Sequence, residues 1–303
     1  MAIKTLYPVT IGTDVLDGII EATPDFGHRT TRPISDGLAD PYFSSVISQA
    51  PRMAFTTLAL AKGLALVGFE SVVANVTMYD ATRGDDGEFA SGANHVKYVM
   101  ASGITVPRTL NIPARGDASM SFETMGYSNS STAPLTFTTA QSLGSYTPGN
   151  EELFGLGPVY INGSQITSLV GVNVDFGFSL QADMSDGVIW PKEVKVMSRL
   201  PVIRIRTSDS GNLVRALTAS ASNYRGALCL DGTNGLKLWA KKRACADGGY
   251  VADATAEHVL ITALDGTVTV GPVTGPNREC VITVEPRRES TASVAIDTTA
   301  AIS

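Results

Sequence analysis

Short runs in which apolar side chains alternate with small or polar ones recur along the whole chain. Residues 170–176 alternate in this way, which is typical of a strand with one buried face. Residues 159–161 precede Asn162-Gly163, a pair that favours the positive φ angles of a tight hairpin turn. Further strands are predicted at 9–11, 72–79, 95–100, 118–122, 259–264, 267–270 and 280–284. The pattern therefore predicts a mostly-β fold of the sandwich or barrel kind.

One segment has helical rather than strand periodicity. Its apolar positions fall on one helix face: Leu58, Leu60, Ala61, Leu64 and Ala65. Thr56 or Thr57 is expected to cap its start, and Gly68 to close its end. Residues 208–217, with Ser208 or Asp209 as cap, predict a second short helix.

The sequence repeats itself at an offset of 150 residues. Residues 1–57 and 151–207 share 15 identities without a gap, where composition alone gives about 3 or 4. Beyond this stretch the match continues with a growing offset, pairing His95 with His258 and Gly103 with Gly266. We therefore predict two tandem β-sandwich or barrel-forming domains from an internal duplication, each with a short flanking α-helix. They span 1–150 and 151–303, and the Ser-, Thr-, Gly- and Pro-rich stretch 128–150 is expected to connect them.

Each copy contains one unusually long connection, between an Asp-Phe-Gly sequence and the predicted helix. These connections span 28–54 and 178–206, and segments of this length within a compact domain are often functional. We expect arms that contact other subunits. The candidate contact residues are Asp36, Gly37 and Pro41 in the first arm, and Asp186 and Gly187 in the second.

Composition and charge exclude several classes of protein. Hydrophobic residues make up 44% of the 303 residues and charged residues 17%, which excludes a disordered chain. The net charge of −6 disfavours a typical nucleic-acid binder. Three cysteines, Cys229, Cys245 and Cys280, exclude a disulfide scaffold and indicate reduced thiols. The start of the chain lacks a long apolar stretch, and the most apolar run, 54–69, contains Lys62, so we expect neither a cleaved export signal nor a membrane partner.

Motifs for catalysis or cofactor binding do not occur in the sequence. It contains no H-E-x-x-H, G-x-S-x-G, Walker A or G-x-G-x-x-G pattern, and the histidines lie far apart. Acidic turns, which include Asp183 and the loop with Asp85, Asp86 and Glu88, could hold a hard cation but are more typical of solvated turns. Two Arg-Gly-Asp tripeptides, at 83–85 and 115–117, are interpreted as turns rather than adhesion motifs. We expect no enzymatic activity, no cofactor and no metal.

Positive charge is concentrated in one part of the second copy. Residues 190–245 contain eleven Lys or Arg against three acidic residues, a net charge of +8, and the remainder carries −14. This segment could face nucleic acid, or it could attract acidic surfaces of neighbouring subunits, and the second interpretation suits an acidic self-assembling protein better. The candidate contacts are Lys192, Lys195, Lys241, Lys242 and Arg243.

The order of these features resembles the tail tube proteins of long-tailed bacteriophages. The resemblance rests on a first hairpin at 9–20, an arm through Asp36-Gly37 and Pro41, the run at 50–64, and paired strands around His95. It implies β-sandwich domains whose sheets join a barrel around a central channel, in stacked rings of six domains. With two domains per chain, it implies three chains per ring with pseudo-six-fold symmetry. The family has no catalytic residues to transfer.

The resemblance leads us to expect a structural virion protein that forms a tail tube, a conduit for the genome. It would be made in the cytoplasm of a bacterial host and would contact copies of itself. Other expected partners are tape-measure, terminator and baseplate proteins, with viral DNA passing through the lumen without specific binding. The alternatives are another virion component, such as a terminator, baseplate ring or capsid decoration, or a carbohydrate-binding or adhesin module. Exposed clustered Trp and Tyr would favour the last, and both tryptophans, Trp190 and Trp239, lie in the second copy.

Overall fold

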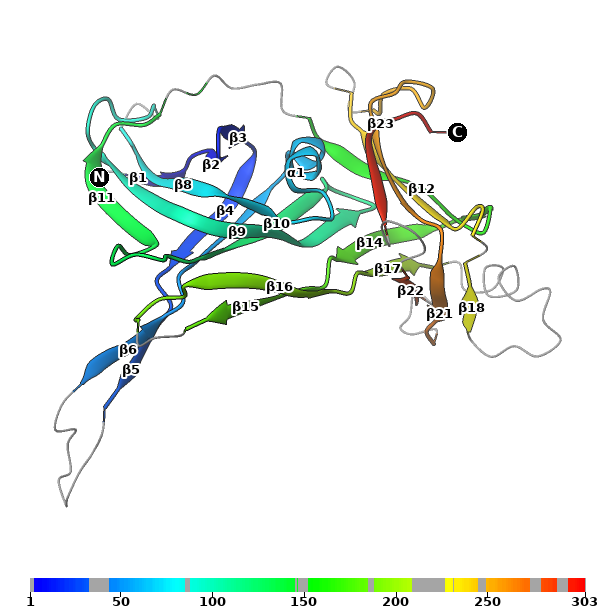
Figure 1. Ribbon diagram of the computed structural model, residues 1–303. Coiled ribbons are helices and arrows are strands. Elements are labelled where there is room, and N and C mark those ends of the chain that lie inside the picture. Colours follow the sequence, from blue (N-terminus) through cyan, green and yellow to red (C-terminus); the bar gives the residue numbers. More distant parts are fainter. Residues whose placement is uncertain are drawn as a thin grey trace.

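The computed structural model is mostly β, as the sequence predicts, with a single α-helix among the residues that it describes (Figure 1). The structure describes residues 3–32, 44–84, 88–144, 146, 152–184, 188–208, 227–230, 232–244, 249–272, 279–287 and 294–302. The first half contributes β1 (Ile3–Leu6), β2 (Val9–Ile11), β3 (Asp14–Leu16), β4 (Ile19–Asp25), β5 (His28–Thr31), β6 (Ser45–Gln49), β7 (Arg52–Thr57), α1 (Leu60–Val67), β8 (Val72–Arg83), β9 (His95–Pro113), β10 (Ser119–Gly126) and β11 (Leu135–Gln141). The second contributes β12 (Phe154–Ile161), β13 (Ser164–Ile166), β14 (Leu169–Asp175), β15 (Phe178–Asp183), β16 (Glu193–Arg199), β17 (Val202–Thr207), β18 (Ala227–Cys229), β19 (Leu236–Lys242), β20 (His258–Ala263), β21 (Gly266–Val270), β22 (Cys280–Pro286) and β23 (Ala295–Ala300).

The strands pair in the same order in the two halves. The largest sheet runs β4-β7-β10-β9 through the first half and continues β14-β17-β22-β21-β18 through the second. In the first half, β2 pairs with β8, β8 with β9, and β9 with β11, while β12, β19, β20 and β23 form the corresponding series in the second. The pairs β4·β7 and β14·β17 also share a bulge at the same place. This order is what a duplication would produce, although the common origin of the halves stays a prediction.

The halves differ in how far their strands extend. β8 and β9 are continuous, with 12 and 19 residues, and β9 pairs with β8 and β11 through its first part and with β14 through its last. In the second half, the residues that correspond to β8 form two strands, β18 and β19. Those that correspond to β9 also form two strands, β20 and β21. The second half therefore has two separate sheets where the first has one continuous sheet that bends.

The core of the first half lies between its bent layers and the helix. Phe55 on β7 and Phe122 on β10 are buried and stack with their ring centroids 5.2 Å apart. The predicted helix is confirmed as α1, and Gly68, at φ +59°, ends it as expected. Thr57 is not the N-cap residue: Ala59 occupies that position, directly before Leu60, and the Thr57 hydroxyl accepts a hydrogen bond from Ala59 N at 2.9 Å. The second predicted helix lies almost entirely at 209–226, outside the described residues.

The two halves join edge to edge through β9 and β14. Residues 109–113 pair antiparallel with residues 171–175, so the sheet continues from one half into the other. The stretch 128–150, which we expect to connect the halves, contains a strand, β11, which pairs with β9, with Leu135 opposite Met100. A Thr-rich sequence suits an exposed edge strand as well as a loop, and the domain boundary stays a prediction. Leu135 is the one buried side chain of β11.

Candidate assembly surfaces

β4 forms an open edge of the largest sheet. Among the described residues its one strand partner is β7, whereas β14, at the equivalent place in the second half, pairs with β17 on one side and β9 on the other. An edge strand presents unpaired N–H and C=O groups that can bind another strand. The described part of the first half therefore has an unpaired sheet edge at β4, whereas the equivalent edge of the second half, at β14, is paired with β9.

The backbone groups on this open edge belong to even-numbered residues. In the second half, Phe176 N donates to Arg108 O at 3.0 Å, so the even positions of β14 face β9. The equivalent positions are Ile20, Ala22 and Pro24 on β4, followed by Phe26, the counterpart of Phe176. Pro24 has no N–H and stands where β14 has Val174, so the edge of β4 offers one donor fewer. A proline on an edge limits indiscriminate strand addition.

The long connections contain two β hairpins, which we name the first arm (β5 and β6) and the second arm (β15 and β16). The second arm lies along the first half, whereas the first arm projects away from the body (Figure 1). The second arm is held by backbone hydrogen bonds from Ser128 N to Pro191 O (2.8 Å) and from Gln49 N to Ile189 O (2.6 Å). Trp190 Nε1 also donates to Ser130 O at 3.2 Å.

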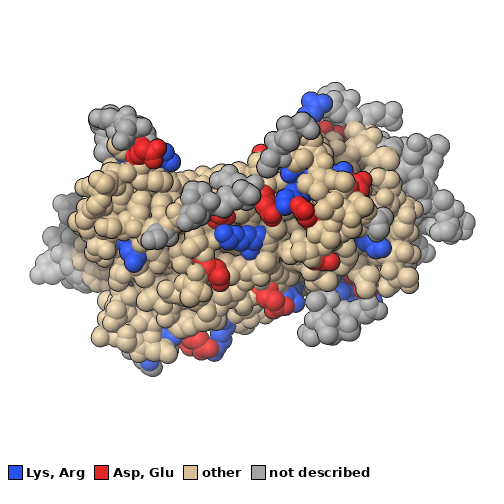
Figure 2. All heavy atoms as spheres, turned by 90° about the horizontal axis from the view of Figure 1, so that it is seen from above, with Lys and Arg blue, Asp and Glu red and all other residues tan. Residues whose placement is uncertain are grey.

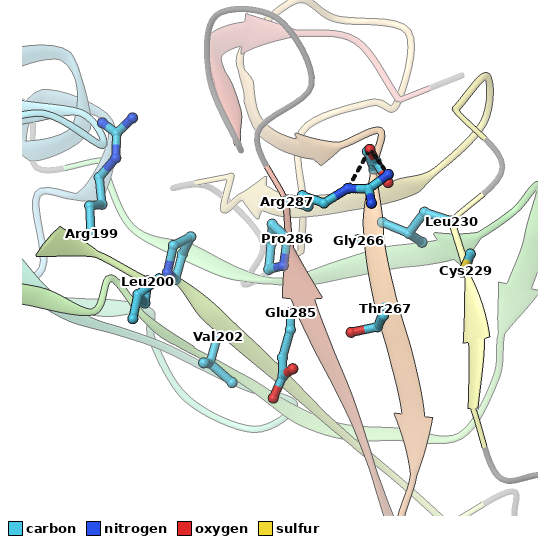
Figure 3. A pocket seen from close by; sticks show the side chains of 12 residues that line it. Arg199, Leu200, Val202, Cys229, Leu230, Gly266, Thr267, Glu285, Pro286 and Arg287 are labelled. Carbon is cyan, nitrogen blue, oxygen red and sulfur yellow. Dashed lines mark hydrogen bonds and ion pairs between the residues drawn. The ribbon is translucent and has the colours of Figure 1, made fainter.

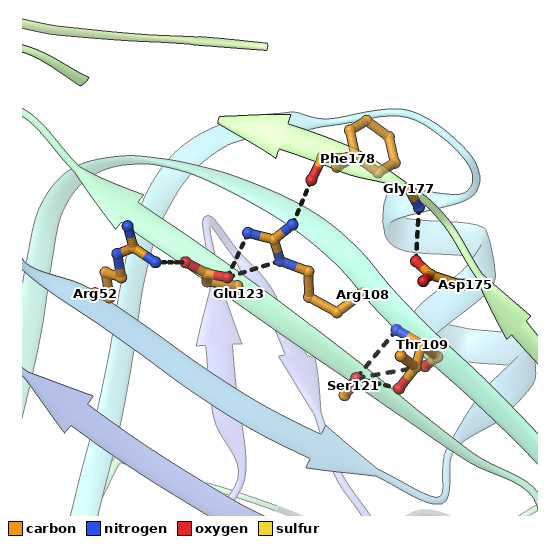
Figure 4. Close-up of polar contacts among 8 residues, drawn as sticks. All are labelled: Arg52, Arg108, Thr109, Ser121, Glu123, Asp175, Gly177 and Phe178. Carbon is orange, nitrogen blue, oxygen red and sulfur yellow. Dashed lines mark hydrogen bonds and ion pairs between the residues drawn. The ribbon is translucent and has the colours of Figure 1, made fainter. Parts of the chain in front are cut away.

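Two arginines fix the base of the second arm. Arg108 on β9 donates from Nε to Glu123 Oε2 at 2.7 Å and from Nη1 to Phe178 O at 2.5 Å (Figure 4). Arg52 donates to the other oxygen of Glu123 at 2.9 Å. Arg199, at the end of β16, lies 2.9 Å from a carboxylate oxygen of Glu70. The arm is thus tied to the first half by charged groups as well as by backbone.

The faces of the two arms differ in polarity. On the second arm, Phe178 and Val194 are 7% and 4% exposed and belong to the core cluster. On the first arm, β5 is exposed over most of its length, and Val46 and Ile47 on β6 are 41% and 47% exposed. The predicted contact residues Asp36, Gly37, Pro41, Asp186 and Gly187 lie outside the described residues.

The basic residues predicted to meet neighbouring subunits have acidic partners within the chain. Lys242 Nζ lies 2.7 Å from carboxylate oxygens of both Glu152 and Glu257, which raises the pKa of Lys242 and lowers that of Glu257. Other such pairs are Lys241 with Asp253, Arg243 with Asp117, and Lys195 with Glu193. The contact of Lys192 with Asp183 is a hydrogen bond between their backbones, from Lys192 N to Asp183 O at 2.9 Å. Figure 2 shows charges scattered over a mostly uncharged surface. Contact of these residues with another copy stays a prediction.

Arg243 also joins the two halves. Its guanidinium donates to Gly116 O at 2.7 Å and lies 2.7 Å from Asp117 Oδ1. Gly116 and Asp117 belong to the second Arg-Gly-Asp tripeptide, in the turn between β9 and β10. The motif therefore has a structural role in this chain.

A pocket of about 900 Å³ lies in the second half at the ends of β18, β21 and β22 (Figure 3). Cys229, Leu230 and Thr267 form part of its wall, and Arg287 pairs with Asp265 through Nη2 at 2.7 Å. The lining side chains are a mixture of apolar, polar and charged groups. No local pattern in the sequence predicts this pocket, because its lining residues come from four separate segments.

The histidines that match in the repeat are both buried and perform the same structural task. His95 Nδ1 accepts from Thr82 N at 2.9 Å, and His258 Nδ1 accepts from Lys242 N at 3.1 Å. In both rings Nε2 lies within hydrogen-bonding distance of a backbone carbonyl. Within the described residues, no group of three or more His, Cys, Asp or Glu side chains could hold a metal ion. Asp85 and Asp86 lie outside that set.

Two further observations concern the alternatives from the sequence. Trp239 is buried, at 1% exposed, and the indole of Trp190 is bonded to the first half, so the tryptophans do not form an exposed aromatic cluster. No helix in the described part of the chain is long and apolar enough to span a membrane. Comparison with protein-family models gives no match, and comparison with curated proteins gives none either.

Proposed function

We propose that this chain is a structural virion protein, three copies of which form a ring with pseudo-six-fold symmetry. The rings stack into a phage tail tube through which the genome passes. The observation that carries the proposal is the junction of β9 with β14, which joins two halves of like topology into one continuous sheet. A junction of this kind can be repeated between chains, and a head-to-tail contact that closes by rotation gives a ring.

The open edge of β4 supports this arrangement. It is the counterpart of the β14 edge, which is already paired with β9 inside the chain. In a ring, the second half of one chain would meet β4 of the next, so that the edge of β4 would be paired. The low proportion of charged residues, 17%, fits surfaces that are buried between subunits. The acidic net charge fits a lumen that does not retain DNA, because neutralised phosphates would bind tightly.

The expected partners follow from this role. They are other copies of the chain, tape-measure, terminator and baseplate proteins, and viral DNA in transit. The protein is made in the bacterial cytoplasm and functions in the virion. A terminator or baseplate ring would share the same ring geometry but would not stack into long tubes.

Electron microscopy and mass measurement of the purified chain test this proposal. We expect rings of three copies, with a mass three times 31.8 kDa, and tubes at higher concentration. The decisive variant is Ala22→Pro, which removes the outward N–H at the middle of β4, between Glu21 and Thr23, without breaking the bonds of β4 to β7. It should prevent ring closure while thermal unfolding of the single chain stays unchanged.

Ala22→Val is the matched control, because it keeps the N–H and introduces the residue that β14 has at this position, Val172. Ala22 borders a pocket of about 300 Å³, which has room for the added methyl groups. Rings should form with this variant as with the native chain. A native chain that stays monomeric at high concentration in several buffers would refute the proposal. Rings that form equally well with Ala22→Pro would refute the role of the β4 edge.

A further inference from the structure

We infer that the large pocket of the second half receives the first arm of a second copy of the chain. This inference rests on the proposed self-assembly and adds to it the two surfaces that meet. The arm is β5 and β6, and the surface is the wall formed by Cys229, Thr267 and Arg287.

Strand register places this wall at the counterpart of a surface in the first half. Val73 lies opposite Ile104 in the pairing of β8 with β9, and Cys229 lies opposite Thr267 in the pairing of β18 with β21. β9 next pairs with β10 in the first half, and β21 next pairs with β22 in the second, in the same register. Val73 and Ile104 in the first half therefore correspond to Cys229 and Thr267 in the second.

A backbone hydrogen bond extends the correspondence by one more residue. Tyr127 N donates to Ser102 O at 3.1 Å in the first half, and Arg287 N donates to Asp265 O at 2.9 Å in the second. Tyr127 thus corresponds to Arg287. All three wall residues of the pocket have a counterpart in the first half.

In the first half the second arm lies beside this surface, with Ile104 buried and Val73 64% exposed. Val73, Ile104 and Tyr127 line a shared pocket with residues of the second arm and its loop, Asp183, Lys192, Glu193 and Val194. In the second half, the corresponding wall opens into the pocket of about 900 Å³, and Figure 3 shows its side chains. The arm that corresponds by sequence and pairing is the first arm, which points away from its own chain (Figure 1). The second arm lies on the first half of its own chain. For the first arm, the corresponding surface is the pocket wall in the second half of another copy.

The polarity of the arm and the polarity of the surface that binds it, which we call its seat, differ in the same direction between the two halves. Side chains that face the first half from the second arm are Phe178, Leu180 and Val194, and the first arm has His28, Thr30 and Ser44 at those positions. The seat changes from Val73, Ile104 and Tyr127 to Cys229, Thr267 and Arg287. At these positions the arm and its seat are thus both more polar than their counterparts, while Val46, opposite Thr30 on the same face of the arm, and Leu200 and Val202 in the pocket wall are apolar. This match supports contact, because polar groups need partners when an interface excludes water.

Charged groups lie on both surfaces. Arg32 is exposed just beyond β5 on the first arm, and Glu285 lines the pocket beside Arg199 and the Arg287–Asp265 ion pair. Opposite charges across an interface favour one partner and register over others. A second copy of the chain is therefore the occupant that the observations favour.

Cysteine crosslinking tests the inference, because the exposed Cys229 already lies in the pocket wall. Ser44 corresponds to Val194, which borders the counterpart of Cys229 in the first half. We expect Ser44→Cys, treated with a short bismaleimide, to give covalent dimers and trimers in denaturing gels. Replacing Cys229 by Ser in the same chain should abolish at least nine-tenths of this product. Ser45→Cys is the matched control, because side chains alternate along a strand and Ser45 faces the other way.

The outcomes separate this inference from the proposed function. Rings that form without a crosslink dependent on Cys229, or equal crosslinking of Ser44→Cys and Ser45→Cys, would refute the seat while leaving the ring proposal intact. A crosslink that forms at the same yield in the Ala22→Pro variant, which should not close rings, would show that the arm binds independently of the sheet edge and would still support the seat. A chain that neither assembles nor crosslinks would refute both.

Discussion

Replacing Arg108 by methionine should loosen the second arm from the first half. The change keeps most of the aliphatic length but removes contacts to Glu123 (2.7 and 2.5 Å) and to Phe178 O (2.5 Å). Hydrogen bonds to charged groups contribute about 1.5–3 kcal/mol, and exposed ion pairs about 0.2–1 kcal/mol. The Arg108 side chain is 31% exposed and that of Glu123 14%, so the environment lies between these cases. We expect a loss of about 2 kcal/mol.

Urea denaturation of the single chain measures this loss. At a slope of about 2–3 kcal/mol per molar urea, the midpoint should fall by about 0.7–1 M. Arg52→Met is the matched control, because Arg52 contacts the same carboxylate but is 47% exposed, and it should cost about 0.5 kcal/mol. Hydrogen exchange should rise in β15 and β16 for Arg108→Met alone. Equal midpoints for the two variants, or unchanged exchange in the second arm, would refute the reasoning.

Two further predictions concern folding of the single chain. Gly177 has φ +64°, and a Cβ there would overlap Leu200 O, so Gly177→Ala should cost at least about 2 kcal/mol. Gly232→Ala, at φ +74° with no atom within 4 Å, should cost about 1 kcal/mol, and equal unfolding midpoints would contradict this. Lys242 lowers the pKa of Glu257 below 4.5, so their contact contributes above that pH and is lost as pH falls through the lowered pKa. Glu257→Gln should therefore be less stable than the native chain at pH 7, and the difference should shrink as pH falls through the lowered pKa of Glu257. A difference that does not decrease on acidification would contradict the assignment.

Local patterns in the sequence predicted the local elements of the fold. The hairpin at Asn162-Gly163 is confirmed, with φ +49° and +79° at its two turn positions. The helix at Leu60–Val67 is confirmed because its apolar side chains face the core at helical spacing. Alternating polarity located most strands. These signals are carried by a few neighbouring residues, so they can be read without knowing the rest of the chain.

Contacts between distant segments could not be predicted in this way. The pairing of β9 with β14 and the three-residue network of Arg52, Glu123 and Arg108 join positions far apart in sequence. The positive charge of the second half was correctly located, but the acidic residues paired with Lys241 and Lys242 lie in other segments of the same chain. The long offset of the repeat indicated which segments correspond, and it gave no information on how the halves pack.

The junction of β9 with β14 has a consequence for concentration. Because both strands belong to one chain, this contact forms at an effective concentration set by the linker, of the order of millimolar. The β9–β14 contact can therefore be formed in every chain even if its intrinsic affinity is weak. The fraction of chains that form a contact with another chain depends instead on protein concentration. A ring of three such chains would need three bimolecular contacts rather than six. Dilution should break it into whole chains, with both halves of each still joined.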